Sequence, residues 1–188
     1  MSGAHGHIEG SNKQVALLIA VLALFLALAE TLGKGAQTNA LGLNVEASNL
    51  WAFFQAKTIR QTAVRTAAET LELERARATD PAVSEAIAKR IDSWTKTVAR
   101  WESEPETAEG RKELMARAKD AEAKRDVSLA KYHHFEVASA AFQIAIVLAS
   151  ATVITGAAIL TWIAGGLGLI GLFFGLIGLV APNAFHLL

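Results

Sequence analysis

Apolar and polar positions are sharply segregated along this chain. Residues 137–188 contain no Asp, Glu, Lys or Arg. A helix needs about 20 apolar residues to cross a hydrocarbon layer about 30 Å thick, so this run is long enough for two spans. The pair Gly165-Gly166 is suited to a turn between them, and Pro182 to a stop after them. The pattern predicts a transmembrane hairpin with arms at residues 137–163 and 166–181.

A shorter apolar run occupies residues 14–32, directly after Lys13. Two interpretations compete. A basic residue, an apolar core and the small-x-small triplet at residues 27–29 resemble a cleavable signal peptide. A helix over this run would also be about 30 Å long, which is enough to cross a membrane. We expect an uncleaved span. Glu30 then lies at headgroup depth, either as an interfacial acid or as an ion or proton site.

Basic residues predict how the spans are oriented. Three spans place the two termini on opposite sides of the membrane, and Lys/Arg residues near span ends mark the cytoplasmic side. Lys34 follows the first span. Five basic residues precede the second: Arg117, Lys119, Lys124, Arg125 and Lys131. The domain between these spans is therefore predicted to be cytoplasmic, in a multi-pass membrane protein.

The polar middle of the chain has a helical composition. Residues 33–44 contain three glycines and are predicted to be a linker. Residues 45–78 contain neither Gly nor Pro and predict one long helix. Asp80-Pro81 predicts a new start, because Asp caps helices and Pro suits the first helical position. The next helix carries a seam at spacings of 4, 3, 4 and 3: Ile87, Ile91, Trp94, Val98 and Trp101.

A third helix is expected to run without a break into the second span. Ser103 and Glu106 fit a capping box at its start. Its seam is weaker and contains small residues: Leu114, Ala118, Ala121, Ser128, Tyr132 and Phe135.

The predicted fold is an all-α membrane protein with three transmembrane helices and a helical, coiled-coil-like cytoplasmic domain between the first and second. Its parts are a tail at 1–13, a span at 14–32, a linker at 33–44, the cytoplasmic domain at 45–136, spans at 137–163 and 166–181, and a tail at 182–188.

Three helices between two spans leave two arrangements open. The first and third helices can form two legs, with the second lying across the top or folding outward. The Trp94–Trp101 seam would then need a partner from another subunit, and we expect this contact. Alternatively, the 33–44 linker is extended and all three helices bundle within one chain.

Small and aromatic residues supply the candidate contact sites. Gly168, Gly171, Gly175 and Gly178 share one face of the last span, and Gly171-x-x-x-Gly175 is a close-packing motif. We predict packing or oligomerisation at Trp94, Val98, Trp101, Gly171 and Gly175. Aromatic and basic residues also meet early in the first long helix. They form a candidate lipid-interface site at Trp51, Lys57 and Arg60, with ordinary packing as the alternative.

Several chemistries are not expected. Basic and acidic residues are equal in number, 18 each, which argues against a nucleic-acid footprint. Without cysteine there can be no disulfide and no thiolate site. Five histidines occur, at 5, 7, 133, 134 and 186, but their pattern predicts no metal site. No motif predicts a cofactor or a catalytic residue.

Two stretches resemble an uncharacterised bacterial membrane-protein family, a domain of unknown function. They are ASNLWAFFQAKTIRQTA at 47–63 and YHHFEVASAAFQIAIVLASATVIT at 132–155. The resemblance implies a bacterial inner-membrane protein and is consistent with three spans. It implies no activity, cofactor or catalytic residue.

Two functions remain open. The first is a homo-oligomeric scaffold or accessory protein that contacts membrane lipid and assembles through its cytoplasmic helices, with its protein partners unknown. The second is a small channel or transporter with a path lined by Glu30, Gln143 and Thr152. An enzyme is not expected, because no catalytic constellation appears.

Overall fold

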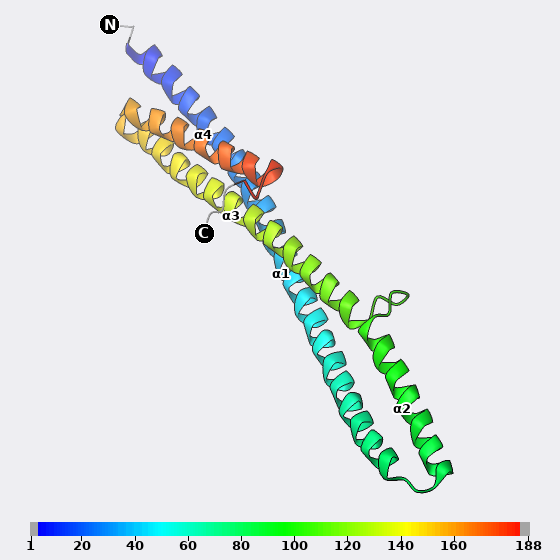
Figure 1. The fold of residues 1–188 in the computed structure, drawn as a ribbon. Coiled ribbons are helices and arrows are strands. Elements are labelled where there is room, and N and C mark those ends of the chain that lie inside the picture. Colours follow the sequence, from blue (N-terminus) through cyan, green and yellow to red (C-terminus); the bar gives the residue numbers. More distant parts are fainter. Residues whose placement is uncertain (1–3, 185–188) are drawn as a thin grey trace. The chain divides into compact units, whose positions relative to one another are not determined.

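The computed structural model describes the backbone of residues 4–184 and the side chains of residues 13–184. This part of the chain is all-helical, with four helices in the order α1, α2, α3 and α4 (Figure 1). Their bounds are Ala4–Arg77, Pro81–Glu102, Arg111–Thr155 and Ala158–Val180. Within the described residues three helices, α1, α3 and α4, are long and apolar enough to cross a membrane.

The chain divides into two compact units. The span unit consists of the residues up to Leu41 and those from Lys124 onward, and the arm unit consists of residues 42–123. Helices α1 and α3 each contribute a segment to both units.

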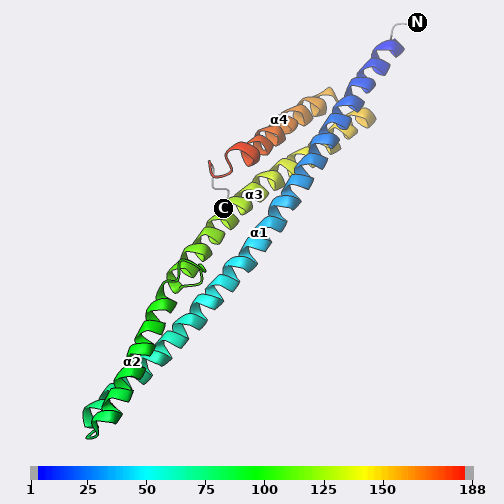
Figure 2. The ribbon, with the colours of Figure 1, turned by 90° about the vertical axis from the view of Figure 1, so that its right-hand side faces the viewer.

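In the span unit α1, α3 and α4 lie side by side (Figures 1 and 2). Three buried residues of α1 recur at an interval of seven: Val15, Leu22 and Ala29. They meet a face of α3 made mostly of small residues: Ala138, Phe142, Ala145 and Ala149. Small side chains let helix backbones approach closely.

In the arm unit α2 and the start of α3 pack against the second half of α1. The core contains Ala47 and Leu50 from α1 and Leu114, Ala118 and Ala121 from α3. These α3 residues belong to the seam that the sequence predicts. On α2, Val98 is buried, and Ile87, Ile91, Trp94 and Trp101 are half-buried. Two α1 residues, Val64 and Ala68, line a cleft of about 340 Å³ with Trp94 and Val98. The tryptophan seam therefore has a partner within its own chain, although α1 does not fill the space completely.

The 33–44 segment is helical, not the linker that its glycines predicted. A glycine costs a helix only about 1 kcal/mol relative to alanine, and packing can offset that. Gly33 is buried, and a Cβ built there would lie 3.2 Å from the Cβ of Phe135. Its missing side chain lets α1 approach α3, so this glycine serves helix packing.

The turn of the apolar hairpin is also not where the sequence predicted it. Helix α3 ends at Thr155, and Gly165 and Gly166 lie inside α4. The chain turns at Gly156, whose φ of +71° is a left-handed conformation that favours glycine. The Thr155 hydroxyl supports the turn by accepting a hydrogen bond from the Ala157 amide at 3.3 Å. The expected 137–163 span is therefore divided, and its last residues belong to α4.

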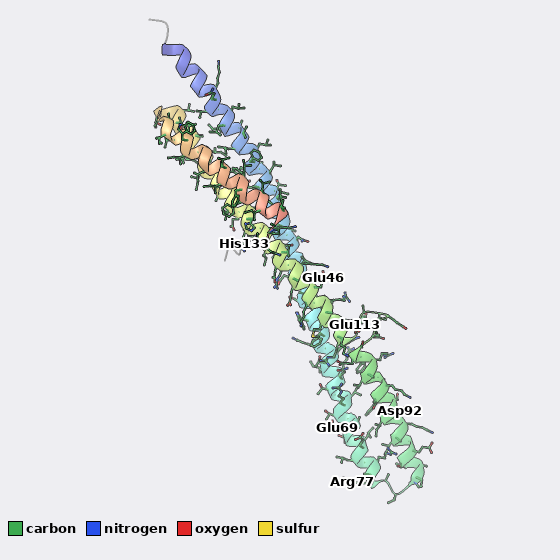
Figure 3. The ribbon with its side chains drawn as sticks, turned by 45° about the horizontal axis from the view of Figure 1, so that its top comes forward. Glu46, Glu69, Arg77, Asp92, Glu113 and His133 are labelled. Atoms are coloured by element: carbon green, nitrogen blue, oxygen red, sulfur yellow. The ribbon has the colours of Figure 1, made fainter. Side chains whose placement is uncertain are left out.

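The start of the third helix is likewise later than predicted. Ser103 is the C-cap of α2, and α3 begins at Arg111 after a loop in which Ala108 has φ of +55°. The capping box expected at Ser103 and Glu106 is wrong. Glu113, at the start of α3 (Figure 3), accepts hydrogen bonds from the Ser103 hydroxyl at 2.6 Å and the Glu104 amide at 3.1 Å. Asp80, in contrast, caps α2 as the sequence predicted, accepting from the Ala82 amide at 2.8 Å.

Candidate functional site

A cluster of hydrogen-bonded polar side chains lies at the junction of α2 and α3 in the arm unit. Its centre is Gln61 of α1, which is only 1% exposed. The Gln61 amide donates to the Val98 carbonyl at 2.9 Å and to the Glu102 carboxylate at 3.2 Å. Arg111 donates to the Gln61 carbonyl oxygen at 3.0 Å and to Glu102 at 2.8 Å. One glutamine thereby connects all three helices of the unit.

Lys57 lies one turn away from Gln61 and is also buried. Its ammonium donates to the Glu109 carbonyl and lies 3.7 Å from the Glu104 carboxylate. The guanidinium of Arg111 lies 4.9 Å from the centre of the Phe54 ring, a cation–π distance. These contacts join the loop between α2 and α3 to α1.

The electrostatics of this junction favour the charged forms of two carboxylates. The pKa of Glu102 is lowered, chiefly by the hydrogen bond from Gln61 and further by the nearby Arg111 charge. The pKa of Glu113 is lowered, chiefly by the hydrogen bond from Ser103. Both shifts arise from hydrogen bonds and charges within the junction. We call the cluster of Lys57, Gln61, Glu102 and Arg111 the clamp, because it joins α2, α3 and the loop between them to α1.

This geometry changes the interpretation of the candidate lipid site. Trp51 is half-buried, and its indole N–H donates to Glu122 at 2.9 Å. Lys57 is in the clamp, and Arg60 alone of the three is exposed. The sequence could not reveal that Trp51 and Lys57 face α3 and the loop before it, because both positions share a helix face with solvated charges.

Three of the four glycines on the predicted face of α4 are buried, and Gly175 is half-buried. Gly168, Gly171 and Gly178 are buried. A Cβ at Gly171 would lie 2.7 Å from the Phe142 ring, whereas one at Gly175 would meet nothing within 4 Å. Gly175 instead lines an apolar groove of about 150 Å³, together with Gly171, residues of α1 such as Phe25 and Leu28, and Phe135 of α3.

The three residues of the proposed transport path do not come together. The Gln143 amide donates to Glu30 at 3.2 Å, and both side chains are exposed. Thr152 is buried and lies nine residues further along α3, where it donates to the Leu148 carbonyl at 3.2 Å. The Thr161 hydroxyl of α4 donates to Thr152 at 3.2 Å. Thr152 thus joins two helices near their turn, about 13 Å along the helix axis from Gln143.

One buried histidine ties the end of α4 to α3. His134 is 1% exposed, its Nε2 lies 3.0 Å from the Pro182 carbonyl, and its ring stacks on Phe174. Among the described residues no group of three or more His, Cys, Asp or Glu side chains could hold a metal ion. The side chains of His5, His7 and His186 lie outside the described residues.

Comparison with known proteins adds a family but no activity. No curated protein and no solved structure matches this chain significantly. A family model matches residues 11–181, a range that takes in the arm unit and most of the span unit. The chain therefore belongs to the family described as a domain of unknown function, DUF4337.

Proposed function

We propose that this protein is a homo-oligomeric membrane scaffold or accessory protein, assembled through the helices of its arm unit. The observation that carries the proposal is an uncharged, exposed stripe on α1, which we call the outer stripe. It consists of residues spaced by seven: Val45, Ala52, Ile59, Thr66 and Leu73. Val45 is 59% exposed, Ile59 70% and Leu73 64%.

The outer stripe faces away from the packing contacts of α1 within the arm unit. Those contacts use other positions, including Ala47, Leu50 and Gln61. Large aliphatic side chains at regular spacing are costly to leave in water, and the arm unit is rich in charged residues elsewhere. A seven-residue apolar repeat is typical of a seam between two helices. The stripe therefore fits another long helix.

A second copy of the chain is the partner that this stripe fits best. Copies anchored in one membrane by the same spans have the same orientation, so their α1 helices would run parallel and their stripes would meet at equal heights. A two-fold axis then places each stripe against itself, which is the commonest symmetry of homo-oligomers.

The proposal assigns no catalytic activity to the chain. The titratable side chains gathered in the arm unit, chiefly Glu102, Arg111 and Lys57, bind one another or the backbone and hold helices together. Such a clamp gives a rigid arm, which suits a scaffold.

We also propose that the protein lies in a bacterial inner membrane with the arm unit in the cytoplasm. The support is the number of basic residues beside the arm-side ends of the spans. Ser84→Cys in α2 and Ala158→Cys at the α3–α4 turn provide the test with an impermeant thiol reagent. Labelling of intact cells at position 158 but not at 84 is expected, and labelling at 84 but not at 158 would reverse the orientation.

Co-expression of two differently tagged copies tests the assembly. The copies should co-purify from one membrane preparation, and Ile59→Glu should reduce their co-purification several-fold, because it places a carboxylate in the stripe. Ala116→Glu is the matched control, since Ala116 is exposed on α3 outside the stripe. Loss of co-purification in both variants, or in neither, would contradict the proposed surface.

A further inference from the structure

We propose that the face of the span unit carrying Glu30 and Gln143 is a second contact between two copies of this chain. This inference rests on the proposed function and extends it from the arm unit to the spans. It begins with the hydrogen bond of 3.2 Å from the Gln143 amide to the Glu30 carboxylate.

The position of this pair is unusual for exposed polar groups. Gln143 lies seven residues beyond Glu136, the last charged residue of α3, and so about 10 Å into the apolar segment. The Glu30 carboxylate is turned toward it. Both side chains are exposed within the described structure, although polar groups at such depth normally face protein or water-filled space. A protein contact over the pair would satisfy that rule.

The surface that leads to the pair is shaped for a close helix contact. Along α1 the residues before Glu30 on its face are all alanines and all exposed: Ala16, Ala20, Ala23 and Ala27. Their spacings of 4, 3 and 4 keep them on one helical face. On α3, Ser150 is exposed two turns beyond Gln143. Helix α4 packs elsewhere on α1, where a Cβ at Gly168 would meet Leu22 at 2.8 Å.

The hydrogen-bonding groups of the pair select a second copy as the partner. Gln143 has two amide hydrogens and uses one on its own Glu30. Among the described residues, the second amide hydrogen of Gln143 is a free donor, and the remaining lone pairs of the Glu30 carboxylate are free acceptors. The same face of a second copy offers the matching acceptors and donor. A two-fold axis would let each glutamine also donate to the other copy's carboxylate, so that each carboxylate accepts two amide hydrogens that offset the like charges. Lipid tails cannot supply these partners.

Cysteine cross-linking in native membranes tests this face, since the chain has no cysteine of its own. Single variants Ala20→Cys and Ala27→Cys are oxidised with copper–phenanthroline. The matched controls are Leu28→Cys, at the apolar groove, and Leu169→Cys, on the exposed side of α4. We expect disulfide-linked dimers at positions 20 and 27 and little at 28 and 169. Equal cross-linking at all four positions, or cross-linking at the controls alone, would overturn the contact.

A second series tests the polar pair itself in the Ala27→Cys background. Gln143→Leu should reduce cross-linking several-fold, whereas Glu30→Gln should retain it, because a glutamine still accepts a hydrogen bond. Unchanged cross-linking in Gln143→Leu would overturn the role of the pair. Absence of cross-linking at 20 and 27 while tagged copies still co-purify would refute this contact and leave the proposed function standing. Absence of both would refute the two together.

Discussion

Gln61 illustrates what a single polar residue does inside this protein. It is buried at the point where α2, α3 and α1 meet, and its hydrogen bonds reach Val98 and Glu102 of α2 and Arg111 of α3. Burying an amide is unfavourable unless its groups are paired, so the glutamine favours the one arrangement of helices that pairs them. The clamp thus defines where α2 ends and α3 begins along α1.

Removing Arg111 should therefore loosen the arm unit. Arg111→Met keeps the apolar stem but loses the hydrogen bonds to Gln61 and Glu102 and the contact with Phe54. Breaking such charged hydrogen bonds costs about 1–3 kcal/mol, and a chain of this size loses about 2–4 °C in melting temperature per kcal/mol. Thermal unfolding of the full chain in detergent, followed by circular dichroism, measures the change. Arg100→Met, an exposed change in the last turn of α2, should leave the melting temperature unaltered.

The same clamp predicts a response to acid. Glu102 and Glu113 both have lowered pKa values in the folded protein. A carboxyl group whose pKa is lower when folded adds stability above its ordinary pKa of about 4.5 and loses it as the pH falls through the folded-state value. The melting temperature should be flat near neutral pH and fall below pH 4.5. In Glu102→Gln the melting temperature should fall less steeply with decreasing pH, because one of the two titrating carboxyl groups is gone. A fall of unchanged steepness in this variant would exclude Glu102 as its cause.

Sequence patterns anticipated some side chains in this structure better than others. The small seam of α3 follows from its spacing, and Leu114, Ala118 and Ala121 are buried as expected. The burial of Lys57 did not follow from any pattern, because lysine is ordinarily exposed and its partner is a loop carbonyl. A backbone acceptor has no signature in a sequence.

At the scale of elements, some glycines of this chain lie inside helices and another makes a turn, so glycine alone did not predict where helices end. The helix start at Asp80-Pro81 was predicted correctly because both residues fix local backbone geometry. Gly165-Gly166 and the glycines of 33–44 were misleading, since tertiary packing tolerates glycine inside helices. Gly156, a single glycine after a threonine, makes the real turn.

Paired substitutions should separate the turn glycine from a helical one. Gly156→Ala forces a Cβ into a left-handed conformation, which costs about 1–2 kcal/mol. Gly166→Ala is its control, because a Cβ there meets nothing within 4 Å and alanine favours helix. Melting temperatures should fall for the first and stay equal or rise for the second. The opposite order would place the turn at 165–166.

The two glycines of the close-packing motif should also differ. Gly171→Ala would push against the Phe142 ring and lower the melting temperature, since overpacking a filled contact typically costs 1–3 kcal/mol. Gly175→Ala adds a methyl to the open groove and should be tolerated. Equal effects would mean that both glycines pack against a helix, as the sequence motif alone suggested.

For the whole molecule, composition predicted the all-helical class correctly but not which helix faces pack within the chain. All-helical structure and three helices apolar enough to span a membrane follow from segregated apolar runs. The sequence did not predict which helix faces pack within the chain and which stay exposed. Because α2 and the start of α3 together lie along α1, the tryptophan seam meets α1 in its own chain. The outer stripe of α1 stays exposed in this arrangement. The sequence did not single it out, because its residues are seven positions apart with polar residues between them.

Native mass spectrometry of the full chain, released from a mild detergent, tests the central claim most directly. A subunit has a mass of 20.0 kDa. We predict a discrete multiple of that mass for the wild type, and the single-subunit mass with helicity retained for a variant carrying both Ile59→Glu and Leu73→Glu. A wild type that remains at the single-subunit mass in several detergents would contradict the account.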